Sequence, residues 1–177
     1  MKKNPFKAAL QANKQLIGCW VGTASPYLTE IYASIGFDWL ALDGEHGPND
    51  LRTILGQLQA MAGYDSAPVV RLPHGDATRI KHLEEICAVD GVDGVFFGPD
   101  ALAASMGLIL EPGHPSVKAA VEEGMKLVLS RGKAAGILTA DKAFAQRCLD
   151  LGAQFVAVGV DTLMIVNSAR ALLQQYR

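Results

Sequence analysis

The chain has 177 residues, half of them hydrophobic and 19% charged, which suits one globular domain with a sizeable core. Sixteen basic and eighteen acidic side chains leave a net charge of −2, and no cluster of Lys and Arg indicates nucleic acid or an anionic membrane as a partner. No apolar run is long enough to cross a bilayer and no signal-peptide core follows the first residues, so we expect a cytoplasmic protein. The three cysteines, Cys19, Cys87 and Cys148, are widely spaced, which favours buried thiols over disulfides or a zinc site.

Strand and helix patterns alternate along the whole chain, with apolar runs between amphipathic segments. In chain order we expect a helix at 5–13, a strand at 16–22, a helix at 26–34, a strand at 39–43, a helix at 50–62, a strand at 67–72, a helix at 76–88, a strand at 91–100, a helical turn at 101–106, a helix at 115–131, a strand at 133–138, a helix at 141–151, a strand at 154–160 and a last helix to about 175. Such alternation demands parallel strands with helices outside them, which is an α/β fold.

Cap residues mark several of the helix boundaries. Ser25 before Pro26 is a plausible N-cap with proline at the first helical position. Gly36 and Gly152 each follow a helix and precede a strand, as C-cap glycines do. Asp161 follows the last strand, where we expect it to cap the final helix rather than to support a site. The helix at 50–62 should bury a face made of Leu51, Ile54, Leu55 and Leu58.

Polar side chains gather at the end of the strand at 39–43. This run is apolar throughout, as in a strand buried on both faces, and it ends in Asp43, Glu45 and His46. Arg71 closes the next strand, where its charge is costly unless it meets an anion. Because carboxyl ends of parallel strands meet at one edge, these groups could face one pocket. Two alternatives remain open: a solvated polar turn, and a salt bridge from Arg71 to Asp43 or Glu45 that joins the strand ends.

At these residues the sequence resembles the HpcH/HpaI aldolase family, which includes 4-hydroxy-2-oxoheptanedioate aldolase and 2-dehydro-3-deoxyglucarate aldolase. The most specific motif is Asp-Gly-Glu-His-Gly-Pro at 43–48. The matching stretches follow the order of the family and lie at 18–22, 36–50, 67–73, 89–99, 132–138 and 155–162.

The resemblance implies a (β/α) TIM-barrel-type fold, which typically needs about 250 residues and eight strands. Relative to it the fourth and fifth βα units are absent, so we expect one domain, 1–177, shortened to about six parallel strands. The seam lies at Leu83–Glu84, and the helical spacing of Ile80, Leu83, Ile86 and Cys87 continues through it. Six strands cannot close with the shear of eight, so an open sheet, a smaller barrel or an oligomer that completes the barrel all remain possible.

The activity implied by the resemblance is a divalent-metal-dependent pyruvate aldolase. Such an enzyme cleaves 4-hydroxy-2-oxo acids or 3-deoxy-2-oxo sugar acids to pyruvate and an aldehyde, with a role in aromatic-compound catabolism. By resemblance, His46 is the catalytic base, Arg71 binds pyruvate and stabilises charge, and Asp43 is the carboxylate beside the histidine. Magnesium, manganese or cobalt would act as a Lewis acid on the pyruvate oxygens.

The metal ligands are where the sequence departs from the family pattern. One ligand comes from a Gln-x-Glu motif that is absent here. The other is an aspartate whose position is taken by Ala101, with Asp100 one residue early, so Asp100 is the candidate ligand. Gly98, Pro99 and Asp100 are also the candidate substrate-binding residues of this strand end. Glu84 or Glu85 at the seam could replace a family carboxylate that raises the basicity of the histidine.

Three functions therefore compete: a metal-dependent aldolase, a non-catalytic relative that oligomerises, and a small-carboxylate binder that uses Arg71 without a metal. A homo-oligomer is expected in each case, because an open sheet edge exposes unpaired backbone groups and the last helix carries apolar residues. The remaining histidines, His74, His82 and His114, are interpreted as surface or loop residues.

Overall fold

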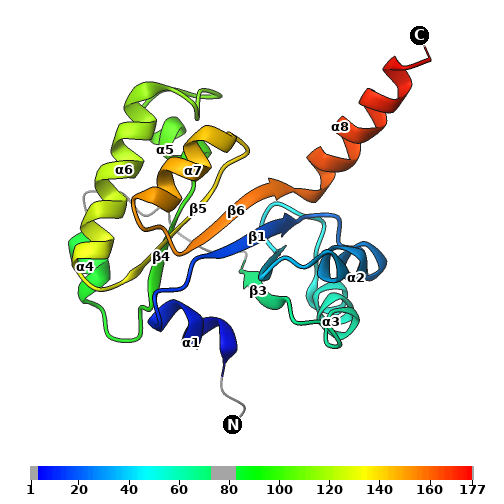
Figure 1. Ribbon diagram of the computed structural model, residues 1–177, viewed down its shortest axis with the longest axis horizontal. Coiled ribbons are helices and arrows are strands. Elements are labelled where there is room, and N and C mark those ends of the chain that lie inside the picture. The colour runs from blue at the N-terminus through cyan, green and yellow to red at the C-terminus, as the bar shows by residue number, and fades with distance from the viewer. Residues whose placement is uncertain (1–3, 73–82, 177) are drawn as a thin grey trace. The chain divides into compact units, whose positions relative to one another are not determined.

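The computed structural model describes residues 4–72 and 83–176, and helices and strands alternate along it (Figure 1). The strands are β1 (Leu16–Val21), β2 (Trp39–Asp43), β3 (Ala67–Arg71), β4 (Gly94–Phe97), β5 (Ala134–Leu138) and β6 (Phe155–Val160). The helices are α1 (Pro5–Gln11), α2 (Pro26–Ile35), α3 (Leu51–Ala60), α4 (Leu83–Ala88), α5 (Pro99–Ser105), α6 (Pro115–Ser130), α7 (Lys142–Asp150) and α8 (Asp161–Gln174). The first part of the helix expected from residue 76, with His74 and His82, lies outside the described residues.

The described residues form two compact units. One comprises 4–16 and 83–158, and the other comprises 17–72 and 159–176. In the second unit β2 lies between β1 and β3 and is parallel to both. In the first unit β5 lies between β4 and β6, again parallel to both. The prediction of parallel strands with intervening helices is therefore confirmed.

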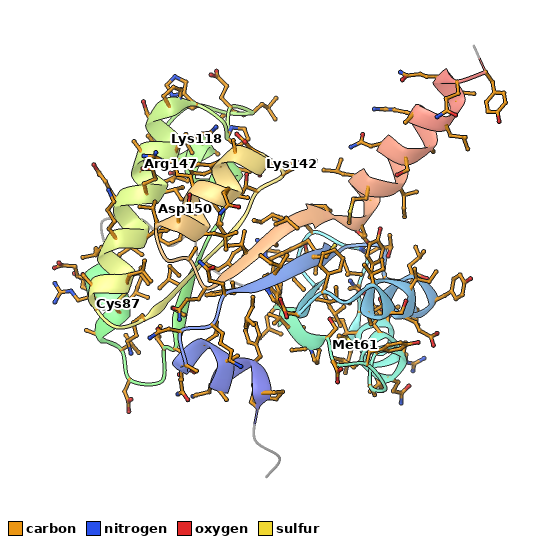
Figure 2. All side chains as sticks on the ribbon, viewed as in Figure 1. Met61, Cys87, Lys118, Lys142, Arg147 and Asp150 are labelled. Carbon is orange, nitrogen blue, oxygen red and sulfur yellow. The ribbon has the colours of Figure 1, made fainter. Side chains whose placement is uncertain are left out.

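The core of the second unit forms around β2, whose five residues are all buried. Cys19 and Val21 of β1 pack with Leu40 and Leu42 of β2, and Tyr32, Ala33 and Met61 cover them from α2 and the end of α3. Met61 is labelled in Figure 2 at this position. A strand that is covered on both faces has no solvent-facing positions, which explains why its sequence is apolar without alternation.

The core of the first unit depends on one face of α6, which packs on β4, β5, α4 and α5. Its buried residues recur at helical spacing and are Val117, Val121, Gly124, Met125 and Val128. A Cβ added to Gly124 would lie 2.6 Å from the Phe97 ring, so this glycine allows α6 to approach β4.

The cap residues largely follow the predictions. Ser25 accepts the Leu28 amide hydrogen at the start of α2, and Gly36 ends that helix with a left-handed φ of 102°. Asp50 and Thr53 form a reciprocal capping box at α3. The cap expected at Asp161 is wrong, because Val160 is the N-cap and Asp161 is the first residue of α8.

Other details of the prediction change with tertiary packing. Leu51 and Leu55 are exposed, and only Ile54 and Leu58 of the expected apolar face pack on the core. The strand expected at 91–100 is shorter, because α5 begins at Pro99, where proline is favourable at a first helical position. Cys19, Cys87 and Cys148 are free and buried, as expected. Among the described residues, none of the helices is long and apolar enough to cross a membrane.

Candidate functional site

The strand ends of β2 and β3 bring two predicted site residues together. The parallel register pairs Asp43 directly with Arg71, so both side chains leave the sheet at the same edge. Nη1 of Arg71 lies 3.8 Å from Oδ2 of Asp43. His46 follows three residues after Asp43, and its Nδ1 lies 2.9 Å from Nη1 of Arg71. The predicted set of Asp43, His46 and Arg71 is therefore one cluster within the second unit.

Two glycines allow the chain after β2 to turn this tightly. The Gly44 amide donates to the Arg71 carbonyl at 3.0 Å, and a Cβ at Gly44 would lie 2.6 Å from that oxygen. A Cβ at Gly47 would lie 2.8 Å from the Asp43 carbonyl oxygen and 2.9 Å from that of Gly22. Any larger side chain at either position would push the turn away from the strand ends.

Asp43 is buried and its carboxylate oxygens are well supplied with donors. Its Oδ1 accepts the amide hydrogens of Glu45 and His46, both at 3.0 Å, and its Oδ2 accepts Nε1–H of Trp20 at 2.8 Å. Burial acts to raise the pKa of Asp43, but these hydrogen bonds and the Arg71 charge outweigh it and hold the pKa below its ordinary value. Asp43 is thus a fixed anion that organises the turn carrying His46.

Arg71 connects every charged group of the cluster. Its Nη2 pairs with Oε2 of Glu45, and Nε2 of His46 lies 4.0 Å from Oε1 of the same carboxylate. The guanidinium also lies over the Trp20 ring, 5.9 Å from its centroid. The salt bridge that the sequence left as an alternative for Arg71 is present, and it lies within the same cluster as His46.

A network of polar side chains, Asn49, Gln57 and Thr29, holds the turn after β2 in place. Nδ2 of Asn49 donates to the Asp43 carbonyl at 2.8 Å, and Oδ1 of Asn49 accepts Nε2–H of Gln57 at 2.6 Å. Gln57 is fully buried, and its Oε1 accepts the hydroxyl hydrogen of Thr29 at 3.0 Å. These contacts join α2 and α3 to the residues that carry His46.

Asp161 holds the loop after β1. Its buried carboxylate accepts the amide hydrogens of Gly22 at 3.0 Å and Thr23 at 3.1 Å, in addition to that of Thr162 at 2.7 Å. Sequence reasoning missed this role, as it missed Trp20, Asn49 and Gln57. The sequence shows only that these polar side chains lie at a strand end or on a helix face, and this position does not identify the group with which each forms a hydrogen bond.

The other predicted site residues belong to the first unit. Gly98 is the N-cap of α5, Pro99 is its first residue and Asp100 lies exposed in its first turn. Glu84 pairs with Arg131 at 2.7 Å, and Glu85 lies beside it on α4. Their assignments to substrate, metal or the histidine therefore stay predictions.

The donor set for a metal does not fit among the residues that the structure describes. No group of three His, Cys, Asp or Glu side chains there could hold an ion. The carboxylate of Asp43 already accepts hydrogen bonds from Trp20 and two backbone amides, and the carboxylate of Glu45 is paired with Arg71. A hard divalent cation prefers several oxygen ligands, so no step below is derived through a metal.

The first unit has an open groove of about 470 Å³ between α6 and α7. Figure 2 labels Lys118 and Arg147 on these helices. Both charges are paired within the unit, Lys118 with Asp141 and Arg147 with Glu122. The groove therefore offers an incoming ligand little unpaired charge.

The comparisons with known proteins were decisive for the family. The model of the HpcH/HpaI aldolase/citrate lyase family matches residues 16–83 and 77–168. The chain belongs to the HpcH/HpaI aldolase/citrate lyase family. The predicted resemblance is therefore confirmed, and this aldolase family is a family of lyases.

Named relatives agree with this membership. A hydroxypyruvate/pyruvate aldolase of Cupriavidus necator is 39% identical over 249 aligned positions, which cover 98% of this chain and 93% of the relative. A 4-hydroxy-2-oxo-heptane-1,7-dioate aldolase of Salmonella dublin is 36% identical, covering 98% of this chain and 95% of the relative.

Solved structures confirm the TIM-barrel-type fold class. A family protein from Burkholderia cenocepacia J2315 has a TM-score of 0.91 and 25% identity, covering 99% of this chain and 100% of that chain. Macrophomate synthase has a TM-score of 0.76 at 16% identity, covering 97% of this chain and 90% of that one, which is a likeness of fold alone. In this family member, the fold places Asp43, His46 and Arg71 at the carboxyl ends of strands, where barrel enzymes carry their sites.

Proposed function

We propose that this HpcH/HpaI family member acts on 2-oxo acids of the pyruvate class, as an aldolase that cleaves 4-hydroxy-2-oxo acids or 3-deoxy-2-oxo sugar acids. The observation that carries the proposal is the contact between Arg71 and His46, 2.9 Å apart at neighbouring strand ends. A cation and an imidazole at this distance can bind a carboxylate and move a proton on the same small molecule. The names of the relatives support hydroxypyruvate or pyruvate as the nucleophilic component.

The chain's own residues suit a retro-aldol cleavage. Arg71 binds the substrate carboxylate through its planar donors. His46 takes the proton of the 4-hydroxyl group, the C3–C4 bond breaks, and its electron pair forms the enolate of pyruvate while the aldehyde leaves. The enolate then regains a proton at C3. Asp43 takes no proton in this scheme, because its hydrogen bonds keep it ionised and fix the turn that carries His46.

The metal requirement is the part of the proposal that the described residues support least. Asp100 remains the candidate ligand, with magnesium, manganese or cobalt as candidate ions. We also propose that this chain lacks the fourth and fifth βα units of the family and that the gap lies near residues 83–84. The family model matches in two stretches that meet at 77–83, and at least 72 of the 249 positions aligned with the Cupriavidus relative have no residue in this chain of 177. The expected cytoplasmic location stays a prediction.

The test is release of pyruvate from a 4-hydroxy-2-oxo acid, measured with added manganese or magnesium and again with a chelator. We expect His46→Ala to abolish release and Arg71→Lys to weaken it strongly, because lysine cannot offer the planar fork. His114→Ala is the matched control, since His114 caps α6 in the first unit. No release by a folded sample would contradict the proposal.

A second candidate function is that of a relative that binds a carboxylate without catalysis. It is favoured because the described residues contain no group of three His, Cys, Asp or Glu side chains that could hold a metal ion. It predicts that pyruvate binds equally well with added metal and with a chelator, that Arg71→Met abolishes this binding, and that no pyruvate is released from a 4-hydroxy-2-oxo acid. Chelator-sensitive release would exclude it.

We further propose that the chain forms a homo-oligomer through α8. Figure 1 shows α8 leading away from the other helices of its unit. Its exposed apolar residues are Leu163, Ile165, Val166, Leu172 and Leu173. A helix with this much exposed apolar surface is typical of an interface. Ile165→Glu with Leu172→Glu should lower the sedimenting mass, because these residues share one face of α8, whereas Asn167→Glu on another face should leave it unchanged. A monomeric wild type would contradict the proposal.

A further inference from the structure

Both terminal nitrogens of the Arg71 guanidinium contact side chains of its own chain. Its Nη1 contacts Nδ1 of His46 at 2.9 Å, and its Nη2 pairs with Glu45. A carboxylate recognised in a two-pronged manner needs two parallel N–H donors of one guanidinium. A substrate carboxylate that binds through Nη1 and Nη2 must therefore compete with partners that are already bound.

These partners differ in how readily they can be displaced. The Asp43 side chain is 6% exposed and also binds Trp20 and two amides, so it is fixed. The side chains of Glu45 and His46 are 28% and 69% exposed, and each can turn into solvent. An ion pair with such exposure contributes little to stability, so a bidentate ligand can replace it. Substrate binding therefore removes Glu45 and His46 from Arg71 and leaves Asp43 in place.

The contact with Arg71 also fixes the state of the His46 ring. Arginine donates hydrogen bonds and accepts none, so Nδ1 of His46 must be the acceptor. The ring proton is then on Nε2, and the Nδ1 lone pair faces the guanidinium. A base whose lone pair is held in this way cannot take a proton from a substrate hydroxyl.

We infer that Glu45 and His46 are displaceable occupants of Arg71, that the carboxylate of a 2-oxo acid replaces them, and that this exchange frees Nδ1 of His46 as the base only when substrate is bound. The inference rests on the proposed function and deepens it, because it makes Glu45 a residue that sets affinity and couples recognition of the acid to activation of the base.

The coupling requires a charged ligand. Pyruvate can displace Glu45 because it carries a carboxylate, whereas pyruvamide has nearly the same shape and no charge. Pyruvamide should therefore leave the contact between His46 and Arg71 intact. Removing the charge of the competitor should have the opposite effect and strengthen the binding of pyruvate.

The experiment is NMR of the full chain labelled with ¹⁵N-histidine, in which His46→Asn identifies the His46 signals. The free protein should show the Nε2–H tautomer alone. Saturating pyruvate should release the His46 ring from Arg71, so that the Nδ1–H tautomer also becomes populated. Pyruvamide should not cause this change. Glu45→Gln should bind pyruvate about two- to fivefold more tightly than the wild type, because the variant has lost the ion pair with Arg71 that competes with the ligand. Glu123→Gln removes the same charge from an exposed position of α6 and should not change the affinity.

The possible failures are distinguishable. Pyruvate that binds, as seen in its own ¹³C signals, without a change in the His46 tautomer would overturn the inference and leave the proposed function standing. Equal affinities of Glu45→Gln and the wild type would overturn it as well. A chain that does not bind pyruvate at all would overturn the proposed function and this inference together.

Discussion

Nε1–H of Trp20 is donated to Oδ2 of Asp43 over 2.8 Å, which joins the end of β1 to the end of β2. The same indole ring lies under the guanidinium of Arg71. Trp20 therefore contacts both the carboxylate of Asp43 and the guanidinium of Arg71. A tryptophan in an apolar strand reads as a core residue, so this role depends on the fold.

Trp20→Phe should lower the free energy of unfolding by about 1–3 kcal/mol, because a buried carboxylate oxygen of Asp43 loses its donor while the aromatic face is kept. Urea unfolding measures this change. Tyr64→Phe is the matched control, since it removes an exposed hydrogen bond to Glu30 and should cost less than about 0.5 kcal/mol. Equal effects of the two variants would contradict the role of Trp20.

The stability should depend on the ionisation of Asp43. Its pKa is lowered in the folded state, so its contribution is complete above the ordinary carboxyl value of about 4 and is lost as the pH falls through the lower folded value. Asp43→Asn should therefore flatten the fall in unfolding free energy below about pH 4.

Asp141→Asn is the comparison for this acid titration. The pKa of Asp141 is lowered by Lys118 and the Phe144 amide, but the group is exposed. Its effect should shrink in about 1 M salt, where charges are screened within ~3 Å, whereas the effect of Asp43→Asn should persist. A wild-type curve that matches Asp43→Asn at every pH would contradict the prediction.

Gln57→Leu should destabilise the protein by about 1–3 kcal/mol, because Oδ1 of Asn49 and the Thr29 hydroxyl would each lose a buried partner. Gln59→Leu places the same substitution on an exposed position of α3 and should change stability by less than about 0.5 kcal/mol. Thermal or urea unfolding compares the two. Under the proposed function, Gln57→Leu should also slow pyruvate release, since Asn49 holds the Asp43 carbonyl.

Cys19 should be unreactive in the native protein. Burial raises its pKa to about 12, with a further contribution from the Asp161 charge, so about one thiol in 10⁴ is ionised at pH 8. Burial likewise raises the pKa of Cys148 to about 11. Mass spectrometry after brief alkylation should find both residues unmodified until urea is added. Rapid native alkylation of Cys19 would contradict its burial.

Much of the site follows from the sequence, because its geometry depends on a repeated rule. Parallel strands end at a common edge, so Asp43 and Arg71 at the ends of consecutive strands were expected to meet, and the register pairs them. His46 then follows from the turn that Gly44 and Gly47 permit. The caps at Ser25 and Asp50 were also predictable, since each depends on residues within one helical turn.

Only the tertiary structure decided which partners these side chains choose. Trp20, Gln57 and Asp161 come from segments that are distant in the sequence from their partners. A hydrogen bond depends on the distance and angle between donor and acceptor, which the spacing of residues in the sequence does not specify. Leu51 and Leu55 show the same limit, because the side of α3 that is buried depends on how the helix packs. The sequence alone determined the family, the parallel strands and the identity of the charged cluster. Only the tertiary structure decided that Arg71 contacts Glu45 and His46, because the pairing of β2 with β3 brings Arg71 beside a turn that lies far from it in the sequence.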